Sequence, residues 1–113
     1  MAYDRELADR IRQLVAAVPD VTEKQMFGGL AFLVGGNMAV SASGRGGLLV
    51  RVDPEESEAL VAETSARLFE MRGRQMRGWL RVEAEDVATA DALAAWVDRG
   101  IAFASSLPPK RRD

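Results

Sequence analysis

The apolar residues near both ends of the chain recur at helical spacing. Near the N-terminus they fall three and four residues apart, and polar residues take the other face. We expect Asp4 to cap this helix and Pro19 to follow its end. A second stripe lies near the C-terminus, with Asp86 or Thr89 as its cap and Trp96 as its anchor in the core. The two stripes are Leu7, Ile11, Leu14, Val15 and Val18, and then Leu93, Trp96, Val97, Gly100, Ile101 and Ala104.

The middle of the chain has the pattern of an antiparallel meander. Strands are predicted at 30–34, 38–42 and 47–52, because glycine-rich turns separate short apolar runs there. The first turn, at 35–37, reads Gly-Gly-Asn, a tight-turn signal of the kind that joins hairpin strands. These three segments therefore predict one half of a sheet.

A short helix is predicted after the third strand. Asp53 is placed to cap it, and Pro54 occupies the first helical position, where an N–H is not needed. Glutamates crowd its first turns, where the helix dipole favours negative charge. Two further strands, 68–71 and 79–82, flank a glycine turn. They predict a second hairpin.

The elements are therefore predicted in the order α-βββ-α-ββ-α, which is typical of an α+β protein. We expect a two-layer domain in which an antiparallel sheet carries its helices on one face. A chain of 113 residues is long enough for one modest core. We assign residues 1–107 to a single domain and residues 108–113 to a short basic C-terminal tail.

The amino-acid composition excludes several kinds of catalytic and metal site. The chain has no cysteine and no histidine, which excludes disulfides, thiolate nucleophiles, imidazole bases and metal sites built on those ligands. The glutamates at 55–63 belong to a helix start, and the carboxylates lack the spacing of a calcium loop. We therefore expect no enzymatic activity, no cofactor and no metal. No signal peptide or membrane span is visible in the sequence, and we expect a cytoplasmic protein.

The segment 67–81 is the most basic part of the chain. It has five arginines and one glutamate, a local net charge of +4 in a chain whose net charge is −2. A solvent-facing turn is predicted to carry Arg72, Arg74 and Arg77 and to contact an acidic protein surface. That surface belongs either to a second subunit in a homodimer or to another protein. The alternative is a nucleic-acid-binding adaptor, with Trp79 as a stacking surface, which the net acidity disfavours. A third interpretation is a solvated hairpin whose arginines pair with the acidic helices.

Two further features are interpreted as structural. Gly28 and Gly29 do not match a phosphate loop, because a strand follows them. We expect a bend there that needs positive φ or a close backbone approach. Methionine and aromatic side chains at strand spacing are expected in the core, with a ligand groove as the alternative. The candidate structural motif is Met26, Phe27, Gly28, Gly29 and Gly78, and the core set adds Met38, Met71, Met76, Phe32 and Trp79.

Five short motifs occur along the chain in a distinctive order. They are Lys24-Gln25-Met26-Phe27-Gly28-Gly29, Gly35-Gly36-Asn37-Met38, Leu49-Val50-Arg51-Val52, Met76-Arg77-Gly78-Trp79, and a helix over Leu93 to Phe103 containing Trp96-Val97. In this order they resemble the N-terminal domain of the TfoX/Sxy family of competence regulators. The resemblance covers nearly the whole chain and implies a two-layer α+β fold with no catalytic residues to transfer. Full-length regulators carry a second, C-terminal domain, which we do not expect here.

Taken with the composition, the resemblance favours a non-enzymatic regulatory or protein-interaction domain. We expect it to act through a protein partner or by self-association. Nucleic-acid binding through the basic hairpin stays open as the alternative, and membrane binding is not expected, because no global charge favours an anionic surface.

Overall fold

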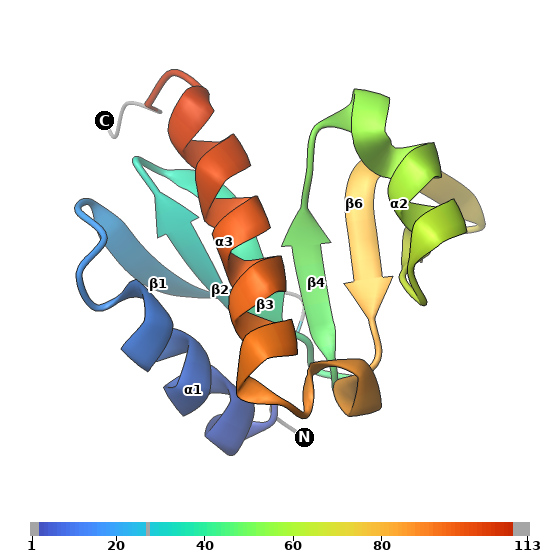
Figure 1. The fold of residues 1–113 in the computed structure, drawn as a ribbon. Helices are drawn as coiled ribbons and strands as arrows, with labels where there is room; N and C mark the ends of the chain where they lie inside the picture. The colour runs from blue at the N-terminus through green and yellow to red at the C-terminus, as the bar shows by residue number, and fades with distance from the viewer. Residues whose placement is uncertain (1–2, 27, 110–113) are drawn as a thin grey trace.

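The computed structural model describes residues 3–26 and 28–109 (Figure 1). Its elements confirm the predicted α+β class and follow the predicted order, with one strand added. They are α1 (Arg5–Val15), β1 (Val21–Met26), β2 (Gly29–Val34), β3 (Asn37–Ala42), β4 (Leu48–Arg51), the 3-10 turn η1 (Pro54–Glu56), α2 (Ser57–Glu63), β5 (Arg67–Met71), β6 (Arg74–Val82), the 3-10 turn η2 (Ala84–Val87) and α3 (Ala90–Ser106).

The strands form one antiparallel sheet of six strands in the order β1-β2-β3-β4-β6-β5. The helix caps expected from the sequence are present. Asp4 accepts hydrogen bonds from the N–H groups of Glu6 and Leu7, and Asp53 accepts one from Glu55 at 2.9 Å. Of the two candidates for the last helix, Thr89 is its cap. Each cap satisfies an N–H that has no partner within its helix.

The added strand, β1, lies at one edge of the sheet. Its residues from Thr22 to Gln25 are polar and exposed, so it lacks the alternation by which a strand is recognised. Charged edge strands of this kind resist pairing with other chains. Arg12 of α1 donates to the Glu23 carboxylate at 2.7 and 3.0 Å and holds the pKa of Glu23 below its ordinary value. This contact joins the first helix to the edge of the sheet.

Helices α1 and α3 cover one face of the sheet, while α2 lies against β6 (Figure 1). The core fills the space between α1, α3 and this face. Gly100 lets α3 approach β3 closely, because a Cβ there would lie 2.5 Å from the Ala39 carbonyl oxygen. Large buried side chains of the core include Ile11, Phe32, Leu48, Val50, Leu80 and Leu93.

The two helical stripes need one correction each. Leu14, which the predicted apolar stripe includes, is 39% exposed, because the buried face of α1 includes Ala8 and leaves Leu14 at its rim. Trp96 is only partly buried. It flanks the stripe of Leu93, Val97 and Gly100, and Arg99 lies 5.5 Å from the centre of its ring.

The C-terminal helix is followed by a contact with the β2–β3 hairpin. The amide of Asn37 donates a hydrogen bond of 2.9 Å to the carbonyl of Pro108. Residues 110–113 of the predicted tail lie outside the described residues. In the described part of the chain, no helix is both long and apolar enough to cross a membrane.

Candidate functional site: an arginine-lined hollow on the open face of the sheet

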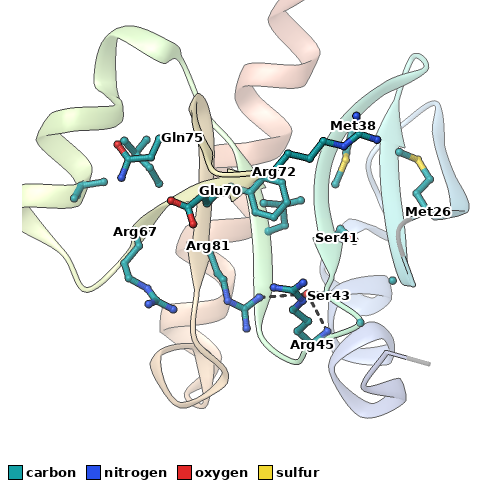
Figure 2. Close-up of a pocket in the computed structure, with 16 residues that line it drawn as sticks. Met26, Met38, Ser41, Ser43, Arg45, Arg67, Glu70, Arg72, Gln75 and Arg81 are labelled. Carbon is teal, nitrogen blue, oxygen red and sulfur yellow. Dashed lines mark hydrogen bonds between the residues drawn. The ribbon is translucent and has the colours of Figure 1, made fainter. Parts of the chain in front are cut away.

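The face of the sheet opposite α1 and α3 contains a hollow of about 730 Å³ (Figure 2). Strand pairing places one row of residues straight across all six strands on this face, since direct cross-strand neighbours project to the same side. The row is Lys24, Ala31, Ser41, Leu49, Arg81 and Arg67. It begins and ends with cations, and its middle is small or apolar.

The hollow exists because small residues occupy the middle of this face. Gly29, Ala31 and Ser41 come from the central strands β2 and β3, and all three are buried. Larger side chains, Met26 and Met38, rise beside them as part of the lining. The Ser41 hydroxyl is a polar group at the floor, in a residue only 4% exposed, and its hydrogen bond to the Ala42 carbonyl is long, at 3.4 Å.

The glycine pair at the start of β2 lies beside this floor. Gly28 has a φ of +78°, which L side chains rarely adopt. Gly29 is crowded, because a Cβ there would lie 2.4 Å from the Ala42 carbonyl oxygen. The two glycines therefore hold the bend at which β2 begins against the end of β3. Phe27, the neighbouring residue of the predicted motif, lies outside the described residues.

The opposite wall of the hollow is the outer part of the β5–β6 hairpin. Leu68 pairs with Leu80, but the next residue, Phe69, pairs with Met76. Residues 77–79 of β6 therefore have no partner on β5 and form a wide bulge, which bends a strand. Beyond the bulge, Phe69, Glu70, Arg72 and Gln75 line the hollow. We call residues 69–76 the arm.

Gly78 is the centre of this bulge. Its φ is +89°, and a Cβ there would lie 3.1 Å from the Cγ of Pro54. Its N–H donates to the hydroxyl of the fully buried Ser57 at 2.7 Å. A strand N–H that lost its ladder partner is thus satisfied by the first residue of α2, which fixes the arm relative to the rest of the sheet.

Four arginines surround the hollow, and they fall into two pairs. Arg81 and Arg67 share the carboxylate of Glu83, and Arg81 also donates to the Gly46 carbonyl at 2.9 Å. Arg45 lies on the β3–β4 turn and Arg72 at the tip of the arm, at different sides of the hollow (Figure 2). Within residues 3–26 and 28–109, neither of these two has an acidic side chain at ion-pair distance.

The predicted interaction residues do not share one surface. Arg72 lines the hollow, and Arg74 is exposed on the same turn without lining it. Arg77 points to α2, where it pairs with Glu58 at 3.2 Å and donates to the Pro54 carbonyl at 3.0 Å. Trp79 is half-buried outside the hollow, 5.0 Å from the Arg51 guanidinium, which also lies 5.7 Å from the Phe103 ring.

The methionine and aromatic residues expected in the core lie in different parts of the molecule. Phe32 is fully buried in the core, as expected. Met38 is 7% exposed, and it lines the hollow together with Met26. Met76 was wrongly assigned to the core and is 38% exposed, because it lies on the arm beyond the bulge. The side chain of Met71 lies outside the described residues.

Sequence reasoning missed the contributions of the other strands to this site. Arg45, Ser41 and Leu49 lie 18 or more positions away from the basic segment, and only the register brings them beside it. The available signal was Arg45 itself, a lone cation in a glycine-rich turn.

The chemistry of the hollow suits the binding of an anionic group. Guanidinium groups are planar donors that match carboxylate and phosphate geometry. The floor between them is apolar or small, which suits an apolar group beside an anionic one. Among the described residues, no cluster of acidic side chains is placed to hold a metal ion.

A comparison with protein families gives a match for this chain. A search of the curated proteins gives no match. The profile of the TfoX N-terminal domain matches residues 13–104, a span that runs from the last turn of α1 through all six strands and into the last turn of α3. This chain therefore belongs to the TfoX N-terminal domain family.

Proposed function

We propose that this domain is a non-enzymatic, cytoplasmic protein-interaction module with a regulatory role, which binds an acidic protein partner. Its acting unit is the single domain of residues 1–107. The observation that carries this proposal is the arginine-lined hollow on the sheet face opposite α1 and α3. Membership of the TfoX N-terminal domain family supports regulation rather than catalysis.

The arrangement of charges supports an acidic partner. Arg45 and Arg72 stand at different sides of the hollow, so a partner that places carboxylates at both is fixed in orientation as well as attracted. Complementary charge of this kind raises the association rate and excludes wrong partners. Arg74 extends the positive surface around the tip of the arm. Arg77 is not included, because its contacts are with Glu58 and Pro54.

The second candidate is a nucleic-acid-binding adaptor that uses the same hairpin. The observation in its favour is Phe69, an aromatic side chain among the lining arginines that would offer a base a stacking surface. Two observations count against it. The net charge is −2, which repels a polyanion, and Glu70 lines the same hollow.

Affinity capture from the native cell, followed by mass spectrometry, supplies the partner for the test. The captured partner is then titrated against the wild type and against the double variant Arg72→Asp/Arg74→Asp. Aspartate tolerates the left-handed backbone at Arg72, where φ is +55°. The matched control is Arg99→Glu, a charge reversal on the exposed surface of α3.

The proposal predicts that the double variant weakens partner binding at least about tenfold while Arg99→Glu does not, because a reversed charge repels the acidic surface. Equal binding by all three proteins would contradict it. A gel-shift assay with duplex and single-stranded DNA and RNA at physiological salt tests the alternative, the nucleic-acid-binding adaptor. Micromolar nucleic-acid binding that the double variant abolishes would replace the interaction module with the adaptor.

A further inference from the structure

We propose that the hollow binds an extended segment of the partner in which acidic and apolar side chains alternate. This inference rests on the proposed function and adds the form and chemistry of the partner. It is a binding site assembled from β2, β3, β4 and the arm, with Arg45 and Arg72 as its carboxylate contacts and Leu49 and Phe69 in its apolar floor and wall.

The shape of the hollow favours a linear segment over a compact ligand. Its lining reaches from Met26 on the edge strand β1 to Arg67 on the other edge strand β5, so it crosses the whole sheet. Six strands spaced ~4.8 Å apart span about 24 Å. An extended chain rises ~3.3 Å per residue, so about seven residues fit across this face.

The side chains of the lining account for the alternation. In an extended segment, successive side chains point to opposite sides. Every second side chain can therefore face the apolar floor, which includes Leu49, while its neighbours reach toward the rim. The rim offers the guanidinium groups of Arg45 and Arg72, which have no ion-pair partner within the described part of the chain. Acidic residues between apolar ones therefore satisfy both kinds of surface.

Polar groups inside the hollow match the backbone of such a segment. The Ser41 hydroxyl lies at the floor, and its 3.4 Å bond to the Ala42 carbonyl is at the limit of hydrogen-bond length. Glu70 and Gln75 on the arm supply acceptors for peptide N–H groups. A nucleic-acid strand offers phosphates along its whole length, and Glu70 would repel them.

A second copy of this chain fits less well. Its acidic helix α2 is short, with seven residues, and the carboxylate of Glu58 is already paired with Arg77. Inserting α2 of one copy into the hollow of another would also bring Glu70 against further glutamates. An extended acidic segment can place its carboxylates at the rim, away from Glu70.

The test is selection of a phage-displayed library of random peptides, about ten residues long, against the purified wild-type protein. Enriched peptides are synthesised and titrated against three single charge reversals. Arg45→Glu and Arg72→Asp change the two sides of the hollow. Arg99→Glu is the control, because Arg99 belongs to α3 and does not line the hollow. All three residues are exposed, and circular dichroism checks that each variant is folded.

We expect enriched peptides in which aspartate or glutamate alternates with apolar residues. Arg45→Glu and Arg72→Asp should each weaken their binding about tenfold or more, and Arg99→Glu should weaken it less than about threefold. Amide shifts on titration should map to Gly29, Ser41 and Leu49 by NMR.

Three results would overturn the inference: no enrichment, enrichment of basic or purely apolar peptides, or equal binding by all variants. If the captured partner is sensitive to Arg72→Asp and Arg74→Asp but not to Arg45→Glu, the interaction module stands and the hollow is not its site. If single-stranded nucleic acid gives the amide shifts at Gly29, Ser41 and Leu49 and the acidic peptides do not, the ligand class proposed here is wrong.

Discussion

The two faces of the sheet use the same strands for different purposes. On the face under α1 and α3, strand residues such as Phe32, Val40 and Leu80 are completely buried. On the opposite face their neighbours are small, apolar or cationic, and they leave a hollow of about 730 Å³. The alternation of side chains along each strand therefore separates stability from binding within a single layer of backbone. Substitutions on the two faces should accordingly have different consequences.

The largest effect is expected for a large-to-small change on the covered face. Phe32→Ala should lower the free energy of unfolding by about 3–5 kcal/mol, because it leaves a cavity in a packed core. Leu49→Ala, on the open face, should cost less than about 1.5 kcal/mol, since this side chain is already partly exposed. Urea denaturation of the two variants measures the difference. Comparable losses would show that both faces contribute equally to stability.

The next effect concerns the two neighbouring glycines at the start of β2. Gly29→Ala should cost about 1–3 kcal/mol, because its Cβ would meet the Ala42 carbonyl oxygen at 2.4 Å and the backbone must shift. A Cβ at Gly28 would lie in open space, so Gly28→Ala should lower the stability only by the cost of a positive φ, about 1 kcal/mol. Thermal unfolding compares them. A larger loss for Gly28→Ala would show that conformation, and not crowding, sets the floor of the hollow.

Removing the hydrogen bond that supports the arm should lower both the stability of the domain and its affinity for the partner. Ser57→Ala removes the acceptor of the Gly78 N–H and should cost about 1–3 kcal/mol, because a buried donor loses its partner. It should also weaken partner binding, since the arm carries Arg72. Ser65→Ala, at an exposed position, is the control. Hydrogen exchange at Gly78 checks the local effect, and unchanged protection there would contradict this account.

The fold was predictable where local patterns are strong. Glycine turns and caps located five of the strands and all three helices, because turns and helix termini depend on nearby residues. Strand β1 was missed, since its polar residues have no buried face to produce a pattern. Leu14 and Trp96 were misplaced for a different reason: helical periodicity gives the direction of a stripe but not which residues lie at its centre.

The candidate site was predictable only in part. The basic segment pointed to the arm, and Arg72 does line the hollow. The segment could not separate Arg72 from Arg77, because the pairing of Arg77 with Glu58 depends on the bulge at 77–79 and the position of α2. Arg45 and Ser41 join the site through strand register, which is a long-range property of the sheet.

The smallest predicted effect on stability concerns the contact between α1 and the edge strand β1. The Glu23 pKa is lowered by its hydrogen bond to Arg12, so its contribution to stability is present above the ordinary glutamate pKa. That contribution is lost as the pH falls through the lower pKa of the folded state. Glu23→Gln should therefore be slightly less stable than the wild type at neutral pH, and the difference should vanish in acid. A difference that persists at about pH 2 would show that the contact is not ionic.

The central claim is that binding belongs to the open face as a whole and not to the basic hairpin alone. Arg45→Glu tests it most directly, because Arg45 belongs to the β3–β4 turn and meets the arm only across the hollow. Titration of the captured partner should show a loss of affinity of about tenfold or more for Arg45→Glu, and none for Arg99→Glu on α3. An unchanged affinity for Arg45→Glu, with a strong loss for Arg74→Asp, would contradict the claim and return the function to the hairpin.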